Sequence, residues 1–463
     1  MTEKSPSTLI NFFIFNTTLG QEEGTEHEKI LFYYPDADNI DKQSRSVGLS
    51  EAIVHFCGTF APDRPCEVVQ TLKSRQVFYQ PEENFWMIMA PSEVTNKDGN
   101  NIVYHQDEVQ DQALQSILML SYKIFRLFNG PFSMTFNESV DSCRELLKHF
   151  FTRFIKSIKL AQQDLQDVLQ GIRFLPLGKQ QFLKVQQFIN LIEANFSNIT
   201  YAQLLFDDQL IWSSLDLDHT QILYGYLTTN LLPNHQEAEN IKDQNSKDSK
   251  SVIYNLDVQG KFITGPTELG HAASIGKIPR IFINKDGKWE IFAVIVYKVL
   301  DTVLCMLVKY DTIFPTSTST IDFFRKLDKF IGPQIKQLTF DIAEQNIINR
   351  RLSLTEMQYR FIYFNHMNCA FKSSIYPKIN QPAIIGPDLM RLFYDIHAEF
   401  DKSKSNEEFL AKTATDCWVV GKIADQRELF VAQNLKNGSL LDINDEMKKL
   451  VGSLFGNIFY FNS

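Results

Sequence analysis

The residues best suited to chemistry in this chain form the segment Gly270–Lys277, GHAASIGK, which suggests a phosphate-binding loop. Such a loop needs four residues between its glycines, because its backbone N–H groups surround the phosphates, and here there are five. Ile278 follows the lysine, where a Ser or Thr hydroxyl should hold magnesium. The preceding segment Thr264–Leu269 contains Gly-Pro and is no central strand. We therefore expect no nucleotide site here.

The other reactive side chains also lack the spacing that chemistry needs. The six cysteines form no C-x-x-C pair, and the nine histidines are isolated from one another. This pattern predicts reduced, partly buried thiols and no metal site. The motifs H-E-x-x-H, G-x-S-x-G and G-x-G-x-x-G do not occur. The adjacent carboxylates Asp207 and Asp208, and likewise Glu82 and Glu83, are expected to lie solvated in turns. We expect a protein that is not an enzyme and needs no cofactor.

Composition narrows the class of protein further. A length of 463 residues predicts about three domains, and 44% hydrophobic residues, 38 of them Phe, are enough for packed cores and for interfaces. The net charge of −9 argues against broad nucleic-acid affinity, which rests on Lys and Arg neutralising phosphates. The first apolar run, Leu9–Phe15, is too short to span a bilayer, and no other reaches the necessary ~18 residues. We expect a cytoplasmic protein that meets membranes only peripherally.

A supersecondary pattern recurs along the chain: two short strands joined by a polar turn, followed by one amphipathic helix. A hairpin with a single covering helix cannot bury its own apolar face, so such units must pair with one another or with a second protein. Contact with partners is therefore where we expect function. The three copies comprise Tyr201–Phe206, Gln209–Ser213 and Asp218–Leu232; Lys288–Val299, Val303–Lys309 and Ser319–Ile331; and Cys417–Lys422, Glu428–Gln433 and Asn444–Phe455.

The first part of the chain is predicted to follow the order β-β-α-β-β-α. This order describes an α+β fold, an α/β/α sandwich of ~120 residues. Strands are expected at Leu9–Asn16, Lys29–Tyr34, Val77–Tyr79 and Asn84–Ala90, and a long helix at Asp107–Asn129. The first helix carries apolar residues on one face of a 3.6-residue period, which we expect to face the core: Leu49, Ala52, Ile53, Phe56, Cys57 and Phe60.

A second strongly periodic helix is predicted at Asn137–Leu160. Its polar face carries Arg144, Lys148, Arg153, Lys156 and Lys159. A basic amphipathic helix can lie on an anionic membrane, but the apolar stripe is also broad enough for an ordinary core helix with a solvated face. Both readings stay open.

The polar segment Asn234–Ser251 reads as a disordered insertion. We expect boundaries at residues 1–135, a first domain; 136–350, a helical connector and a second domain with the insertion near 234–251; and 351–463, a third domain.

Segments in this order resemble the Ccz family of vacuolar fusion proteins, and the resemblance runs from about residue 9 to the end of the sequence. They are Phe12–Asn16, Lys29–Pro35, Val47–Val54, Pro81–Met87, Leu127–Gly130, Asp207–Ser213, Phe361–Asn368 and Trp418–Lys422.

The resemblance implies three longin-like domains with mainly antiparallel sheets flanked by helices. It also implies an obligate heterodimer with a Mon-family longin subunit, joined in animals by a third, regulatory subunit. That complex is a guanine-nucleotide exchange factor for a Rab-seven-type GTPase. It is recruited from the cytoplasm to late endosomes, lysosomes and autophagosomes, where it contacts anionic or phosphoinositide membranes and promotes endosome maturation and fusion. The alternative is a structural longin subunit of a vesicle tether or adaptor without exchange activity.

The resemblance further implies that the first longin domain, residues 1–135, is the platform for the GTPase and the partner. From the residues themselves we predict that the contact face is the outer side of the helix Ser46–Phe60. Its positions outside the apolar stripe are Ser50, Glu51, Val54 and His55, which are small or weakly charged. An apolar Val54 facing water would fit an interface, although a lone surface valine can equally have no function. On this reading, Val54→Glu would weaken GTPase binding without disturbing the fold.

Overall fold

The computed structural model describes residues 9–62, 65–71, 75–91, 94–98, 101–105, 110–158, 165–237, 260–266, 278–310, 317–352, 359–376, 383–403, 407–435 and 438–455. The predicted loop Gly270–Lys277 and residues 238–251 of the predicted insertion lie outside these ranges. The chain forms two compact units, Met1–Val168 and Leu169–Ser463.

The first unit is built on one antiparallel sheet in the order β2-β1-β5-β4-β3. Its strands are β1 (Leu9–Asn16), β2 (Ile30–Tyr34), β3 (Val68–Gln70), β4 (Arg75–Glu82) and β5 (Phe85–Pro91). A separate two-stranded sheet joins β6 (Val94–Asp98) and β7 (Asn101–His105). The helices are α1 (Ile40–Phe60), α2 (Asp111–Asn129), α3 (Phe132–Glu138) and α4 (Val140–Ser157), with a short 3-10 helix η1 (Glu26–Lys29) before β2.

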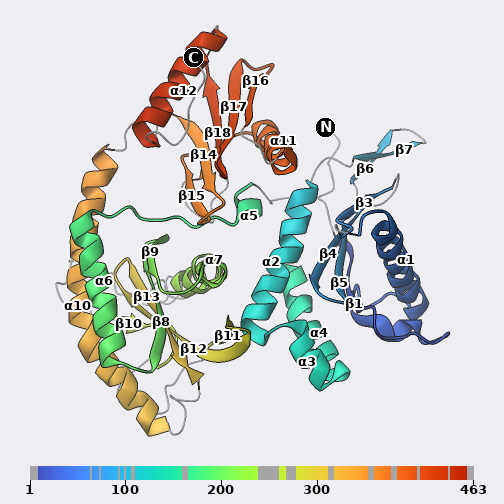
Figure 1. The fold of residues 1–463 in the computed structure, drawn as a ribbon, viewed down its shortest axis with the longest axis horizontal. Helices are drawn as coiled ribbons and strands as arrows, with labels where there is room; N and C mark the ends of the chain where they lie inside the picture. Colours follow the sequence, from blue (N-terminus) through green and yellow to red (C-terminus); the bar gives the residue numbers. More distant parts are fainter. Residues whose placement is uncertain are drawn as a thin grey trace, which may run out of the picture. The chain divides into compact units, whose positions relative to one another are not determined.

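Both faces of this first sheet are apolar and both are covered by helices (Figure 1). On β1, Phe12, Phe13, Ile14 and Phe15 are all fully buried, although successive residues point to opposite faces. The ring of Phe12 lies 5.3 Å from Phe151 of α4, whereas the ring of Phe13 stacks on Tyr33 at 5.5 Å on the α1 side. The predicted α/β/α sandwich is confirmed for this unit.

The long periodic helix predicted at Asn137–Leu160 is instead divided into two. Helix α3 ends at Glu138, and Ser139 has an extended backbone and caps α4, its hydroxyl accepting a hydrogen bond from the N–H of Ser142 at 3.3 Å. Helix α4 packs as a core helix, with Cys143, Leu147, Phe151 and Ile155 buried. The apolar stripe therefore serves ordinary packing over the described length of this helix.

The second unit contains two further antiparallel sheets. The first has the order β10-β12-β13-β8-β9, with β11 also pairing with β12. Its strands are β8 (Ile199–Phe206), β9 (Gln209–Ser213), β10 (Lys261–Phe262), β11 (Arg280–Lys285), β12 (Lys288–Val299) and β13 (Thr302–Lys309). The helices are α6 (Lys179–Asn195), α7 (Leu217–Tyr226), the π-helical turn η3 (Leu227–Leu231) and α10 (Ser317–Leu352), which runs through Pro333 as one helix. The short helix α5 (Leu165–Leu169) lies at the boundary between the two units.

Helices α6 and α10 cover one face of this sheet, and α7 lies over the other (Figure 1). The predicted hairpin-plus-helix copies at 201–232 and 288–331 both belong to this one sheet, because β8, β9, β12 and β13 are neighbours in it. The number of hairpin-plus-helix copies therefore differs from the number of domains they form. The second domain contains the pattern twice, once at its start and once at its end.

The last sheet has the order β15-β14-β18-β17-β16, the same as the first when strands are numbered within each domain. It contains β14 (Arg360–Asn365), β15 (Ala370–Ser373), β16 (Glu407–Lys412), β17 (Cys417–Ala424) and β18 (Arg427–Asn434). Helices α11 (Pro387–Ser403) and α12 (Leu440–Leu454) pack on its opposite faces (Figure 1). Three α+β domains with antiparallel sheets and flanking helices are thus confirmed. Strand β16 is not among the strands that the sequence predicts, because the segment Lys402–Glu407 before it has the composition of a charged loop.

An extended strap, Gly171–Leu175, joins the two sheets of the second unit. Ile172 donates its N–H to the carbonyl of Cys369 at 2.7 Å and accepts from Phe371 at 2.8 Å, which adds it to β15. At the next residue of the strap, the carbonyl of Arg173 accepts a hydrogen bond from the N–H of Leu210 at 2.7 Å, which adds the strap to β9. A Cβ atom at Gly171 would lie 2.3 Å from Cβ of Phe371, so only glycine fits beside that ring.

A buried carboxylate ties α11 to the third-domain sheet. Glu428 on β18 is 1% exposed; its Oε1 lies 2.6 Å from Nε2 of His366, and its Oε2 lies 2.7 Å from Nδ1 of His397 on α11. Burial alone would raise the pKa of Glu428, but the hydrogen bonds from both histidines outweigh it and hold this pKa below its ordinary value of 4.5.

We predict that Glu428→Gln loosens this domain, because the amide loses the charge-assisted bonds to both rings. Amide hydrogen exchange in β18 should reflect a loss of about 2 kcal/mol of local stability. Because folding lowers the pKa of Glu428, its carboxylate stabilises the fold fully at any pH above the pKa of the unfolded state. This stabilisation is lost as the pH falls through the lower, folded-state pKa. The difference in stability between the wild-type protein and Glu428→Gln should therefore shrink below about pH 4. Unchanged exchange in β18 at pH 7 would contradict this; exposed Glu399→Gln on α11 is the control.

Candidate partner-binding surface

Helix α1 is the element to which the sequence assigned partner contact. Asn39 caps its N-terminus, its side chain accepting from the N–H of Asp41 at 3.5 Å, and the N–H of Ala61 donates to Cys57 at the other end. The helix lies along the face of the sheet whose core contains Phe13, Tyr33, Phe78 and Trp86 (Figure 1). Its inner and outer faces follow from the exposure of each side chain.

The inner face contains residues that were predicted to point outward. Ser50 is fully buried, and its hydroxyl donates to the carbonyl of Ser46 at 3.0 Å, which satisfies it within the helix. Val54 is half-buried and packs against the core with Ile53 and Val47. The prediction that Ser50 and Val54 lie on the outer face is therefore wrong, and Val54 is not a surface valine.

The other two predicted contact residues lie at the flank of the helix. The carboxylate of Glu51 pairs with Nζ of Lys29 at 2.8 Å, and the two side chains are only 15% and 13% exposed. This pair joins α1 to the chain just before β2. His55 alone among the predicted four is exposed.

The outer face of α1 is apolar. Phe56 and Phe60 are 65% and 75% exposed, and their rings lie 4.9 Å apart in the solvent. Leu49 is 58% exposed, and Ala52 lies exposed between it and Phe56 on the same face. We name Leu49, Ala52, Phe56 and Phe60 the α1 outer stripe. An isolated subunit that exposes adjacent large apolar side chains along one helix has the character of an interface.

The stripe was recognised in the sequence, but it was assigned to the core. The two faces of α1 are both apolar, so periodicity alone could not decide between Val47, Ser50 and Val54 on one side and the larger side chains on the other. Gly48 gives a further signal. A Cβ atom there would meet nothing within 4 Å, although glycine in a helix interior costs about 1 kcal/mol relative to alanine. No atom of the described chain lies close enough to Gly48 to require a glycine there. The close approach of another protein to this face of α1 would explain the residue.

Of the four carboxylates expected to be solvated in turns, Asp207 and Glu83 are exposed in turns as predicted, whereas Glu82 and Asp208 have partners within the protein. Glu82 accepts from the Tyr122 hydroxyl at 2.9 Å and from the N–H groups of Phe132 and Ser133 at 2.5 and 3.0 Å, so it caps the first turn of α3. Burial, reinforced by this carboxylate, raises the pKa of Tyr122. Asp208 lies 3.5 Å from the guanidinium of Arg173. Glu82 and Asp208 therefore have structural roles: the first caps α3, and the second pairs with Arg173 of the strap.

The basic face of α4 is partly occupied as well. Arg144 donates to the carbonyls of Glu28 and Ile30 at 2.7 and 3.3 Å, and Lys148 pairs with Asp36 at 2.9 Å. Arg153 and Lys156 are exposed. Lys159 lies outside the described residues.

The described part of the chain shows neither a metal-binding cluster nor a membrane-spanning helix. Within those ranges, no three His, Cys, Asp or Glu side chains gather closely enough to hold a metal ion, and none of the helices is long and apolar enough to cross a membrane. The six cysteines are free thiols; three are buried and three partly buried. Burial raises the pKa of Cys305 to about 12, which suppresses its reactivity as a nucleophile.

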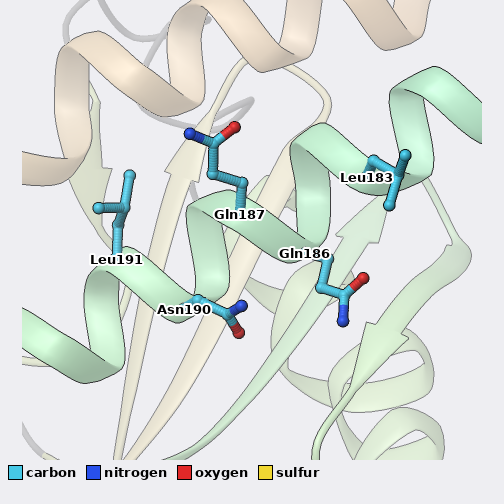
Figure 2. A pocket seen from close by; sticks show the side chains of 5 residues that line it. All are labelled: Leu183, Gln186, Gln187, Asn190 and Leu191. Carbon is cyan, nitrogen blue, oxygen red and sulfur yellow. The ribbon is translucent and has the colours of Figure 1, made fainter.

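One surface depression, of about 310 Å³, lies on α6. Figure 2 shows its lining residues, all from that helix, projecting to either side of it. They are Leu183, Gln186, Gln187, Asn190 and Leu191, none of which titrates near neutral pH. Such a lining can pack and hydrogen-bond, but it cannot transfer a proton.

Comparison with known proteins gives three matches to family models. Residues 9–130 match the first longin domain of INTU, CCZ1 and HPS4, residues 199–332 match Intu longin-like domain 2, and residues 355–450 match Intu longin-like domain 3. Full-length relatives named vacuolar fusion protein CCZ1 homolog are 45% identical in Nematostella vectensis, over 99% of both chains, and 34% identical in Dictyostelium discoideum, over 98% of both. The relative of that name in Danio rerio is 41% identical over 98% of this chain and 96% of its own.

The chain belongs to the CCZ1 family of vacuolar fusion proteins. The resemblance seen in the sequence is thereby confirmed, as are its three longin-like domains. The first match extends from β1 to the end of α2 and so includes α1 with its outer stripe. Helices α4 and α6 lie outside all three matched ranges.

We predict that substitutions on the two faces of α1 have opposite consequences for stability. Val54→Glu places a carboxylate against the core cluster that contains Phe13 and Trp86 and should destabilise the first domain by about 2 kcal/mol or more. Phe56→Glu changes a side chain that is already mostly in water and should alter stability by no more than about 0.5 kcal/mol. Hydrogen exchange in β1 and β5 measures both. Equal exchange rates in the two variants would show that the inner and outer faces have been misassigned.

Proposed function

We propose that this chain is one subunit of a heterodimeric guanine-nucleotide exchange factor for a Rab-seven-type GTPase, with a Mon-family longin subunit as its partner. The complex would be recruited from the cytoplasm to late endosomes, lysosomes and autophagosomes and would promote membrane fusion there. Membership of a family whose members are named vacuolar fusion proteins supports a role in fusion of vacuolar or endosomal membranes. Three longin-like domains, whose described residues gather no metal-binding cluster, favour action by binding.

The observation that carries this proposal is the α1 outer stripe in the first longin domain. Burying Leu49, Phe56 and Phe60 would contribute about 3–6 kcal/mol, since each is already partly covered. Association itself costs about 4–15 kcal/mol. The stripe is therefore too small to hold a partner alone, and the interface must extend beyond α1.

Exchange requires no covalent step. A GTPase that binds the platform in a conformation with displaced switch segments binds nucleotide and magnesium less tightly in that conformation, and coupling is reciprocal. Each ~1.4 kcal/mol of preference for this conformation weakens the nucleotide tenfold. The chain's own contribution is a rigid apolar surface, held in place by the pair Lys29–Glu51 and the caps of α1.

Membrane contact is a second element of the proposal. A third, regulatory subunit would join the heterodimer in animals, and peripheral contact with anionic or phosphoinositide lipids would complete recruitment. On α4, Arg153 and Lys156 are exposed cations that such lipids could meet, and Lys148 is also exposed although it pairs with Asp36.

Nucleotide release from purified Rab proteins tests the proposal directly. The heterodimer should accelerate release from a Rab-seven-type GTPase, while neither subunit alone should do so. A stable heterodimer that accelerates release from no Rab of a panel would instead support a structural subunit of a tether or adaptor.

We predict that Phe56→Glu combined with Phe60→Glu weakens binding of the Mon-family partner or the GTPase by at least about tenfold, because two large apolar contacts are replaced by charges. Co-purification and nucleotide release measure the two steps separately. The matched control is Met119→Glu on α2, which alters an exposed apolar side chain on another helix of the same domain. If the double variant forms a fully active heterodimer, the stripe is not part of the platform.

A further inference from the structure

The edge strands of the two sheets in the second unit differ in whether a neighbouring segment pairs with them. The strap pairs with β15 through Ile172, and it pairs with β9 through Arg173 and Leu175. Strand β16 ends the order β15-β14-β18-β17-β16, and its outer edge pairs with no strand in the described part of the chain. An edge strand offers backbone N–H and C=O groups to any extended segment that approaches it.

A groove runs beside this edge, between β16 and helix α11. It has a volume of about 270 Å³, and one wall is the ring of Phe409 on β16, which is 38% exposed. The buried side chain of Ile396 lies at its base, and α11 lies so close to the sheet that a Cβ atom at Gly421 would come within 2.4 Å of Ile396. An apolar side chain entering from outside would meet Phe409 and Ile396.

Phe409 faces the α11 side of the sheet. Its neighbour Leu410 packs against the core on the opposite side, with Leu450 of α12, and successive residues of a strand alternate in direction. The groove and the open edge therefore lie together, as a bound strand requires: its backbone would pair with β16, and every second side chain would enter the groove.

Charge around the groove is mainly acidic. Asp395 and Glu399 of α11 line it, and its single lysine, Lys402, lies 2.9 Å from Glu399 and neutralises part of that charge. On the other face of β16, Glu408 pairs with Lys422 at 3.1 Å. A segment with Lys or Arg beside its central apolar residue would complement the remaining negative charge.

We propose that the groove between α11 and β16 binds an extended segment of a partner protein, which adds to the sheet as a strand alongside β16. An apolar side chain of this segment packs on Phe409 and Ile396, and basic side chains on the same face approach Asp395 and Glu399. This surface belongs to the third domain and does not depend on the exchange activity proposed above.

The test uses a fluorescein-labelled peptide, Thr-Lys-Thr-Leu-Thr-Lys-Thr, and fluorescence anisotropy with the full chain. As a strand, this peptide places leucine and both lysines on one face. Exchanging both lysines for glutamates should weaken binding about tenfold, since each lysine meets an acidic rim. Equal affinity of the two peptides would refute the charge assignment.

Backbone methylation distinguishes strand addition from any other mode of binding. In one peptide the nitrogens of the odd residues carry methyl groups, and in a second those of the even residues do, with all side chains unchanged. Only one of these sets faces β16 in a paired strand, so one peptide should lose binding and the other retain it. Loss in both, or retention in both, would overturn the proposal and point to a helical or non-specific mode.

Two sets of variants locate the site. Asp395→Lys with Glu399→Lys should weaken the lysine peptide and strengthen the glutamate peptide, each about tenfold. The control pair, Glu193→Lys on α6 and Asp445→Lys on α12, makes the same change of charge at exposed sites away from the groove. Phe409→Ser should weaken both peptides. If the control pair acts as strongly as the groove pair, the binding is general attraction to a charged protein, and the proposal fails.

Discussion

The three large sheets, one in each longin-like domain, must be covered on both faces, and the rest of the structure depends on that constraint. Strand β5 is buried along its whole length, as are Phe12 to Phe15 on β1 and most of β12 and β13. Exposing such strands would forfeit about 25 cal/mol for each Å² of apolar surface. The sandwich of helix, sheet and helix is the arrangement that meets this demand, and it appears in each of the three domains.

The same constraint explains why α1 differs from the other covering helices. The sheet beneath it needs only a modest contact, which Val47, Ser50 and Val54 provide. The bulkier side chains Leu49, Phe56 and Phe60 lie on the outside. Beside them lies Gly48, where a Cβ atom would meet nothing within 4 Å in the described chain. Helix α1 therefore covers the sheet with its smaller residues and leaves Leu49, Phe56 and Phe60 exposed. This exposed apolar face is the basis on which a protein partner is proposed above.

Much of the architecture could be read from the sequence, because it rests on local patterns. Strands such as β1 and β5 are short apolar runs bounded by turns, and Gly130 marks the end of α2 with its positive φ of 79°. The family could be recognised from short segments spread along the chain. The orientation of α1 could not be derived in this way, since both of its faces are apolar and only tertiary packing decides between them. Strand β16 was missed because Glu407, Glu408 and Lys412 give it the composition of a loop, as is common for protected edges. The roles of Glu82 and Glu428 depend on residues far away in the chain, which no local pattern reveals.

The strap Gly171–Leu175 also means that the third domain's sheet includes a residue from outside the range that its family model matches. The family models match residues 199–332 and 355–450 as separate domains, yet Ile172, which precedes the second longin-like domain, pairs with the edge of the sheet of the third. A fragment that begins at β14 would lack its outermost hydrogen-bonded residue and would leave Phe371 without the backbone of Gly171 against it. The two domains are thus joined by backbone pairing within one compact unit. To keep these edge hydrogen bonds, a transfer of the third domain into another protein would have to include this short extended segment.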